Sequence, residues 1–126
     1  MTPIEKQFAS LKEKFPNAVL SSPDGNGVQL VTIPDVELPP GWSRPKVHVY
    51  FVLPVGYPAA QPDTFWTSTL TLQNGSMPQA TNTSNTAVGV PAGSTWFSWH
   101  PQRWNPNTDS ILNYMRMIRK RLEAVQ

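Results

Sequence analysis

The stretch Lys46–Leu53, which reads KVHVYFVL, decides the fold. Its residues are nearly all β-branched or aromatic, the types that fit an extended, partly buried backbone. Eight residues of this kind without a turn residue predict a central strand, covered on one face and partly covered on the other. His48 alternates with Tyr50 and Val52 along this strand, and we expect it to be a structural histidine.

Further strand patterns lie on both sides of this stretch. Before it, Ala18–Ser22 and Gly27–Ile33 are separated by an Asp-Gly pair, which is a strong turn signal and predicts a hairpin. After it, beyond two proline turns, Asp63–Leu72 resumes a strand pattern. The segment Pro34–Pro45 joins Ile33 to the central strand and contains four prolines. These prolines exclude a helix or a central strand there and predict an irregular connection. We therefore expect a four-stranded antiparallel meander.

Amphipathic helices are predicted at both ends of the chain. The first has an apolar face formed by Ile4, Phe8, Leu11 and Phe15, and Pro16 ends it. The apolar stripe of the second consists of Ile111, Met115, Ile118, Leu122 and Val125. Thr108 or Asn107 is expected to cap the second helix, with Asp109 placed favourably against its positive end. Its opposite face carries four basic residues, which we expect to form a solvated surface: Arg116, Arg119, Lys120 and Arg121.

The segment between the meander and the second helix is the first place to look for function. Gln73–Gly93 is dominated by small polar residues, glycine and proline, and irregular loops of this length inside a domain are usually functional. The chain then becomes aromatic, with three tryptophans close together. We expect Trp104 to be buried and Trp96 or Trp99 to lie nearer the surface.

Composition limits the possible chemistry. The chain has 126 residues, with 39% hydrophobic residues, a net charge of +2 and no cysteine. One α+β domain over residues 1–126 is expected, and thiol chemistry, disulfides and thiolate metal sites are excluded. Two distant histidines give no metal spacing, and no phosphate-binding glycine pattern or other cofactor signature is present. The small charge excess argues against nucleic acid, and the lack of a signal peptide or long apolar run predicts a cytoplasmic protein without membrane contact.

The order of these elements resembles the ubiquitin-conjugating enzyme (UBC) fold. Leu53-Pro54 with Tyr57-Pro58 and Pro62 is similar to the proline and Tyr-Pro signature after the central strand of that fold, and Trp104-Asn105-Pro106 is similar to its Trp-x-Pro element. Three segments resemble the bacterial branch of this superfamily, whose operons also encode ubiquitin-like proteins, an activating enzyme and a JAB-type peptidase. They are LPPGW (Leu38–Trp42), GYPAAQPDTFW (Gly56–Trp66) and WFSWHPQRW (Trp96–Trp104). The resemblance implies an N-terminal helix, a four-stranded meander, a long irregular loop and a C-terminal helix.

The chain departs from that family in one decisive respect. Conjugating enzymes carry ubiquitin as a thioester on a cysteine in the stretch before the Trp-x-Pro element, usually after a His-Pro-Asn motif, and this chain has neither. His100-Pro101-Gln102 is only a partial echo of that motif. The resemblance therefore implies a protein that binds a ubiquitin-like protein or the activating enzyme without forming a thioester. The alternative is a genuine transferase whose cysteine has been replaced, at one of five positions: Ala80, Ala87, Ala92, Ser94 and Ser98.

Several side chains are candidates for the site. The catalytic candidates are His100, Ser94 and Ser98, because a histidine near a hydroxyl can serve as a base. The binding candidates are Trp96, Trp99, Arg103, Tyr57 and Pro58, since tryptophan and arginine are enriched at binding hot spots.

A third function class is a Ser/His-dependent acyl-transfer enzyme or hydrolase. It would combine Ser94 or Ser98 with His100 and an acid such as Asp63 or Asp109. No Gly-x-Ser-x-Gly elbow supports this hypothesis.

Overall fold

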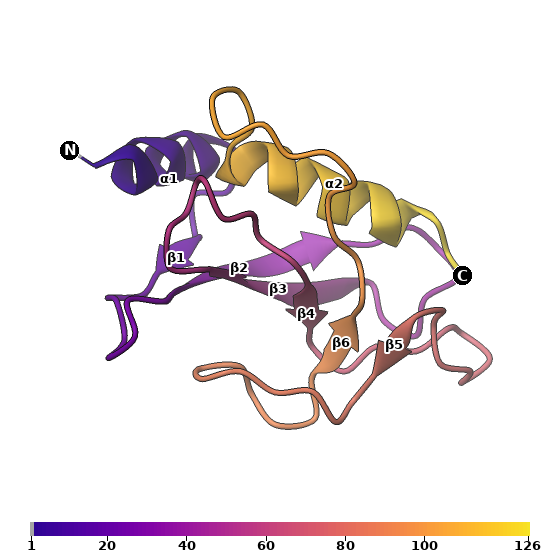
Figure 1. Cartoon of the computed structure of the whole chain (residues 1–126). Helices are drawn as coiled ribbons and strands as arrows, with labels where there is room; N and C mark the ends of the chain where they lie inside the picture. Colours follow the sequence, from indigo (N-terminus) through magenta and orange to yellow (C-terminus); the bar gives the residue numbers. More distant parts are fainter. Residues whose placement is uncertain (1) are drawn as a thin grey trace.

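The computed structural model describes residues 2–126 and contains two helices and one sheet (Figure 1). In chain order the elements are α1 (Pro3–Lys14), β1 (Val19–Leu20), β2 (Gln29–Glu37), β3 (Lys46–Leu53), β4 (Phe65–Thr67), β5 (Thr81–Asn82), β6 (Thr95–Phe97) and α2 (Ile111–Glu123). Both helices lie on one face of the sheet (Figure 1). No helix in this part of the chain is long and apolar enough to cross a membrane.

The sheet has six strands in the order β1-β2-β3-β4-β6-β5, and every neighbouring pair is antiparallel. The first four are the predicted meander, so the α+β class with its two terminal helices is confirmed. The strand predicted over Asp63–Leu72 is shorter in the structure, where β4 ends at Thr67. Beyond Thr67, side-chain hydroxyls take the place of backbone carbonyls as hydrogen-bond acceptors. There the Leu70 amide donates to the Thr95 hydroxyl at 2.9 Å.

Strand β2 runs through Pro34 to Glu37, so the prediction of an irregular connection from Pro34 was wrong in its first residues. The pairing with β3 shifts between Ile33 and Val36, which marks a bulge. Pro34 is tolerated because β1 pairs only with Thr32 and Val31 of β2. Beyond these residues no strand within residues 2–126 lies on that edge of β2, so no backbone amide is needed there as a hydrogen-bond donor. At the bulge Asp35 adopts a φ of 55°, and its amide donates to Nδ1 of His48 at 3.2 Å.

The segment expected to be a long irregular loop contains one regular element, because β5 pairs with β6. The chain after β5 then runs along the sheet face opposite the helices (Figure 1). There the backbone carbonyl of Asn85 accepts a hydrogen bond from the Trp66 indole at 3.1 Å. This loop therefore covers part of the second sheet face.

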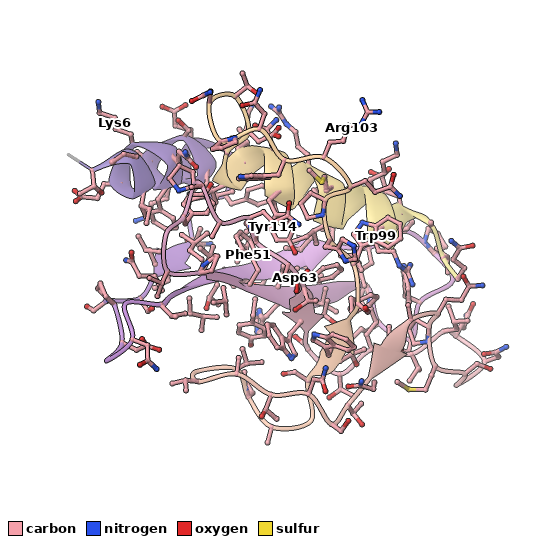
Figure 2. The ribbon with its side chains drawn as sticks, viewed as in Figure 1. Lys6, Phe51, Asp63, Trp99, Arg103 and Tyr114 are labelled. Carbon is pink, nitrogen blue, oxygen red and sulfur yellow. The ribbon has the colours of Figure 1, made fainter. Side chains whose placement is uncertain are left out.

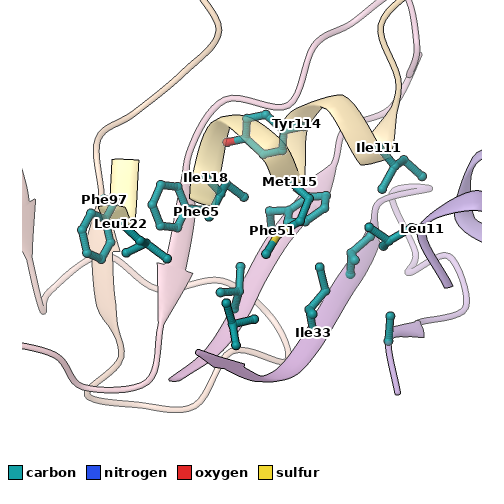
Figure 3. Packing of buried hydrophobic residues seen from close by; sticks show 14 of the residues in the cluster. Leu11, Ile33, Phe51, Phe65, Phe97, Ile111, Tyr114, Met115, Ile118 and Leu122 are labelled. Carbon is teal, nitrogen blue, oxygen red and sulfur yellow. The ribbon is translucent and has the colours of Figure 1, made fainter. Parts of the chain in front are cut away.

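The apolar core lies between the helices and the sheet (Figure 3). The Phe51 ring meets Tyr114 of α2 edge to face at 5.0 Å, and Phe65 stacks on Phe97 at 4.6 Å. Each large side chain buried in this way contributes about 1.5–3 kcal/mol. Four predicted stripe residues of α2 are fully or almost fully buried in this core: Ile111, Met115, Ile118 and Leu122.

The beginning of α2 differs from the sequence prediction. Its N-cap is Ser110, whose hydroxyl accepts from the Asn113 amide at 3.3 Å, and neither Thr108 nor Asn107 caps it. The preceding residues close a turn of their own, because Asn105 accepts at its carbonyl from the amides of Thr108 and Asp109. The helix can therefore begin only after that turn.

Candidate functional site

The site is built by the segment that crosses from β6 to α2, Ser98–Ser110, which runs along the outer side of α2 (Figure 1). The Ser98 amide donates to the Ala80 carbonyl at 2.9 Å, which fixes the start of the segment to the chain before β5. Tyr114 of α2 donates its hydroxyl to the Trp99 carbonyl at 3.4 Å. These contacts tie the first residues of the crossing segment to the chain before β5 and to the first turn of α2.

A groove of about 470 Å³ lies between this segment and the end of α2, and we call it the crossover groove. Its lining is formed by Ser98, Trp99, His100, Pro101, Gln102, Met117, Lys120, Arg121, Ala124 and Gln126. Trp99 is 43% exposed, which is unusual for so large an apolar side chain and makes it available to a partner. The groove thus combines an exposed indole and a flexible thioether with a lysine at its rim.

Arg121 is buried, which corrects the prediction that it belongs to the solvated basic face of α2. Its guanidinium donates to the carbonyls of Ala124, Gln79 and Gln126, each at 3.0 Å, and lies 5.2 Å from the centre of the Phe97 ring. Burial lowers the pKa of Arg121 from its ordinary value. Arg121 is therefore a structural link between α2 and the chain before β5.

The other basic residues of that face are exposed as predicted: Arg116, Arg119 and Lys120. Of these three, only Lys120 lines the crossover groove. Its ammonium is the cation that a partner could reach from within the groove.

His100 faces an acid from a different part of the chain. Its Nδ1 lies 3.7 Å from a carboxylate oxygen of Asp63, a residue that precedes β4 in the chain. Both side chains are more than half exposed. An exposed pair of this kind contributes little to stability, about 0–1 kcal/mol. His100 also lines the crossover groove.

The structure gathers three of the predicted site residues and separates the others. Ser98, Trp99 and His100 line the crossover groove together. Ser94, at the opposite end of β6, is 5% exposed and donates its hydroxyl to the Pro91 carbonyl at 2.7 Å. Trp96 alternates with the core-facing Phe97 and so points to the sheet face opposite the helices.

Tyr57 and Pro58 form a turn beside the crossing segment rather than part of the groove. Their peptide bond is cis, and the Pro58 carbonyl accepts from the Trp104 indole at 2.7 Å. Tyr57 donates its hydroxyl to the side chain of Gln7 on α1, and burial, with the nearby Asp109 charge, raises the pKa of Tyr57. Trp104 is only partly buried in this position, short of the full burial expected.

Arg103 is exposed on the crossing segment and points away from the sheet (Figure 2). It lies next to Trp104, so its backbone is held where the Trp104 indole meets the Tyr57-Pro58 turn. Arg103 and this turn therefore lie near each other, outside the groove.

The geometry does not assemble an activated nucleophile. Within residues 2–126 no hydrogen bond joins Ser98 or Ser94 to a histidine, and the Ser94 hydroxyl is already engaged with a carbonyl. A serine becomes a nucleophile at neutral pH only with a base held against its hydroxyl. The same described residues contain no group of three or more side chains that could hold a metal ion.

Sequence reasoning did not place any residue of α2 in the groove. Lys120 was expected on the solvated face of α2 and Met117 was assigned no role, and only the path of the crossing segment makes both of them part of a groove wall. Asp63 was considered only as a hydrolase acid, and its approach to His100 depends on the pairing of β4 with β6. No local sequence signal encodes either arrangement.

An antiparallel sheet with both terminal helices on one face and a Trp-x-Pro crossing segment is consistent with an E2-like, or UBC-like, fold. The family model described as "Prokaryotic E2 family E" matches residues 15–125, so the chain belongs to that family. It is accordingly an E2-like component of a bacterial conjugation system. No curated protein and no solved structure matches the chain.

Proposed function

We propose that the chain binds a ubiquitin-like protein, or the activating enzyme that delivers it, without carrying it as a thioester. The carrying observation is that a member of an E2 family has no cysteine in its 126 residues. A thioester requires a thiolate, and a hydroxyl can replace it only with a dedicated base, which neither Ser94 nor Ser98 has in the described residues. Noncovalent binding is the part of E2 function that this sequence retains.

The crossover groove is the proposed contact for the ubiquitin-like protein. The exposed Trp99 indole supplies a rigid apolar surface, and Met117 supplies one that adapts its shape. Lys120 adds a cation at the rim that can pair with a carboxylate. An extended segment with apolar side chains and one carboxylate fits this combination.

Arg103, which is exposed, and the partly exposed Pro58 of the adjoining turn are proposed as the contact for the activating enzyme, with the buried Tyr57 supporting that turn. The Trp104 indole, bonded to the Pro58 carbonyl, holds the crossing segment against the turn. Two partners could therefore approach adjoining surfaces.

The proposal is tested by calorimetric titration of the chain with the ubiquitin-like protein encoded beside its gene, and separately with the neighbouring activating enzyme. Trp99→Ala is expected to weaken binding of the ubiquitin-like protein at least about tenfold, because loss of a hot-spot tryptophan costs about 2 kcal/mol or more. Val88→Ala is the matched control, since Val88 is 83% exposed on the sheet face opposite the helices. Failure of the unaltered chain to bind either protein would contradict the proposal.

A genuine transferase with a replaced cysteine is the second candidate, and one observation favours a specific position for it. Of the five positions where a cysteine could have been replaced, only Ser98 lines the crossover groove. Ser98→Cys is therefore the variant to mix with activating enzyme, ubiquitin-like protein and ATP. A protein adduct that reductant removes would support this candidate, and its absence would count against it.

A further inference from the structure

A second pocket lies on the sheet face opposite the helices, and nothing above assigns it. Along β3, Val47, Val49 and Phe51 are buried toward the helices, so alternate residues point to the other face. There a pocket of about 550 Å³ has walls rich in hydrogen-bond donors, and we call it the donor pocket. The lining residues that matter here are Arg44, Lys46, His48, Tyr50, Ser68 and Asp35.

His48 is held as a hydrogen-bond donor. Its Nδ1 accepts the Asp35 amide at 3.2 Å, which requires an unprotonated nitrogen at that position. The hydrogen of the neutral ring therefore lies on Nε2, which makes no hydrogen bond within residues 2–126. The His48 backbone is held separately, because its amide donates to the Ser68 hydroxyl at 2.8 Å.

Tyr50 contributes a second donor. Its side chain is nearly buried, yet its hydroxyl has no hydrogen-bond partner among the described residues. Since no buried side-chain polar atom in that part of the chain lacks a partner, this hydroxyl must open to solvent in the pocket. Burial raises the pKa of Tyr50, so the hydroxyl keeps its proton at neutral pH.

Two cations complete the wall. The Arg44 guanidinium donates from one nitrogen to the Thr69 carbonyl at 3.2 Å, which anchors it and leaves its other donors available. Lys46 lies two residues before His48 on the same strand face. Neither cation forms an ion pair within residues 2–126, and Asp35 is the one acid that lines the pocket. Two cations against one carboxylate leave the lining positive.

We propose that the donor pocket binds an oxyanion, the phosphate or carboxylate group of a small ligand. Arg44 and Lys46 supply the charge, and the Nε2 hydrogen of His48 and the Tyr50 hydroxyl supply directed neutral donors. Charge-assisted hydrogen bonds of this kind are the strong ones in proteins. The site is separate from the crossover groove and does not depend on the function proposed there.

The test is an NMR titration of the ¹⁵N-labelled chain with sodium phosphate and, separately, with sodium acetate. Sodium chloride at matched ionic strength is the reference, because it reproduces general screening without an oxyanion. We expect saturable shifts of the Asp35, His48 and Thr69 amides with at least one oxyanion and none with chloride. Saturation by phosphate alone or acetate alone would identify the group that the pocket prefers.

Two variants make the test specific to the pocket. Arg44→Gln is expected to weaken binding about tenfold, and Tyr50→Phe to weaken it by a smaller factor. Arg116→Gln removes another exposed arginine, on α2 and outside the pocket, and should leave binding unchanged. Oxyanion shifts no different from those with chloride, or equal losses in Arg44→Gln and Arg116→Gln, would overturn the proposal.

Discussion

The two faces of β3 carry opposite chemistry on one strand. Val47, Val49 and Phe51 point into the core beneath the helices and are 0–2% exposed. Lys46 and His48 point the other way, where they line a polar pocket. On this strand the face toward the helices forms part of the apolar core, whereas Lys46 and His48 on the other face are exposed.

The largest expected effect is on the face toward the helices. Phe51→Ala should lower the free energy of unfolding by about 3–5 kcal/mol, because it opens a cavity where the ring meets Tyr114. Urea denaturation followed by circular dichroism measures this loss. A loss below about 1 kcal/mol would show that the two faces do not divide their roles in this way.

The next largest effect is expected from removing the buried charge of Arg121 on α2. Arg121→Met should cost about 2 kcal/mol, since three carbonyls lose their donor. Arg119→Met, a change of the same kind at an exposed position of the same helix, should stay within about 0.5 kcal/mol. Equal stabilities of the two variants would remove Arg121 from the structural framework.

Alkaline pH should weaken the same region. Burial raises the pKa of Tyr114 and Tyr57 above their ordinary value of 10.0, so folding favours their protonated form. The resulting stability is fully present below pH 10.0 and is lost as pH rises above it, because the unfolded chain ionises first. Melting temperatures measured between about pH 8 and pH 11 should therefore fall at the alkaline end, and less so in Tyr114→Phe. A flat profile would contradict this.

The smallest effect is expected on the opposite face of β3. Lys46→Gln should change the free energy of unfolding by no more than about 0.5 kcal/mol, because the side chain is exposed and forms no ion pair in the described residues. The measurement is the denaturation curve used for Phe51→Ala. A loss approaching that of Phe51→Ala would mean that this face also supports the fold.

The residues predict most of the framework and little of the site. The apolar stripe of α2 and the KVHVYFVL strand follow from periodicity, which depends only on near neighbours in the chain. The N-cap of α2 was predicted wrongly because the residues before it form a turn closed by the Asn105 carbonyl. The helix therefore begins after that turn, with Ser110 as its N-cap. The burial of Arg121 depends on carbonyls contributed by distant or terminal residues, which no local pattern reveals.

The candidate site shows the same limit. Trp99 was predicted as a binding residue, and its side chain is 43% exposed. The groove around it exists because the crossing segment lies against Met117 and Lys120, and that path is a property of the whole fold. The class of protein comes from the family match over residues 15–125.

The most direct test of noncovalent binding is one mixture of the chain, an activating enzyme of a bacterial conjugation system, a ubiquitin-like protein and ATP. It is run on a denaturing gel with and without hydroxylamine and reductant, and in parallel on a sizing column. We predict no shifted band of this chain on the gel and co-elution with a partner on the column. A shifted band that hydroxylamine removes and reductant leaves would be an oxyester on a hydroxyl, and it would contradict the account.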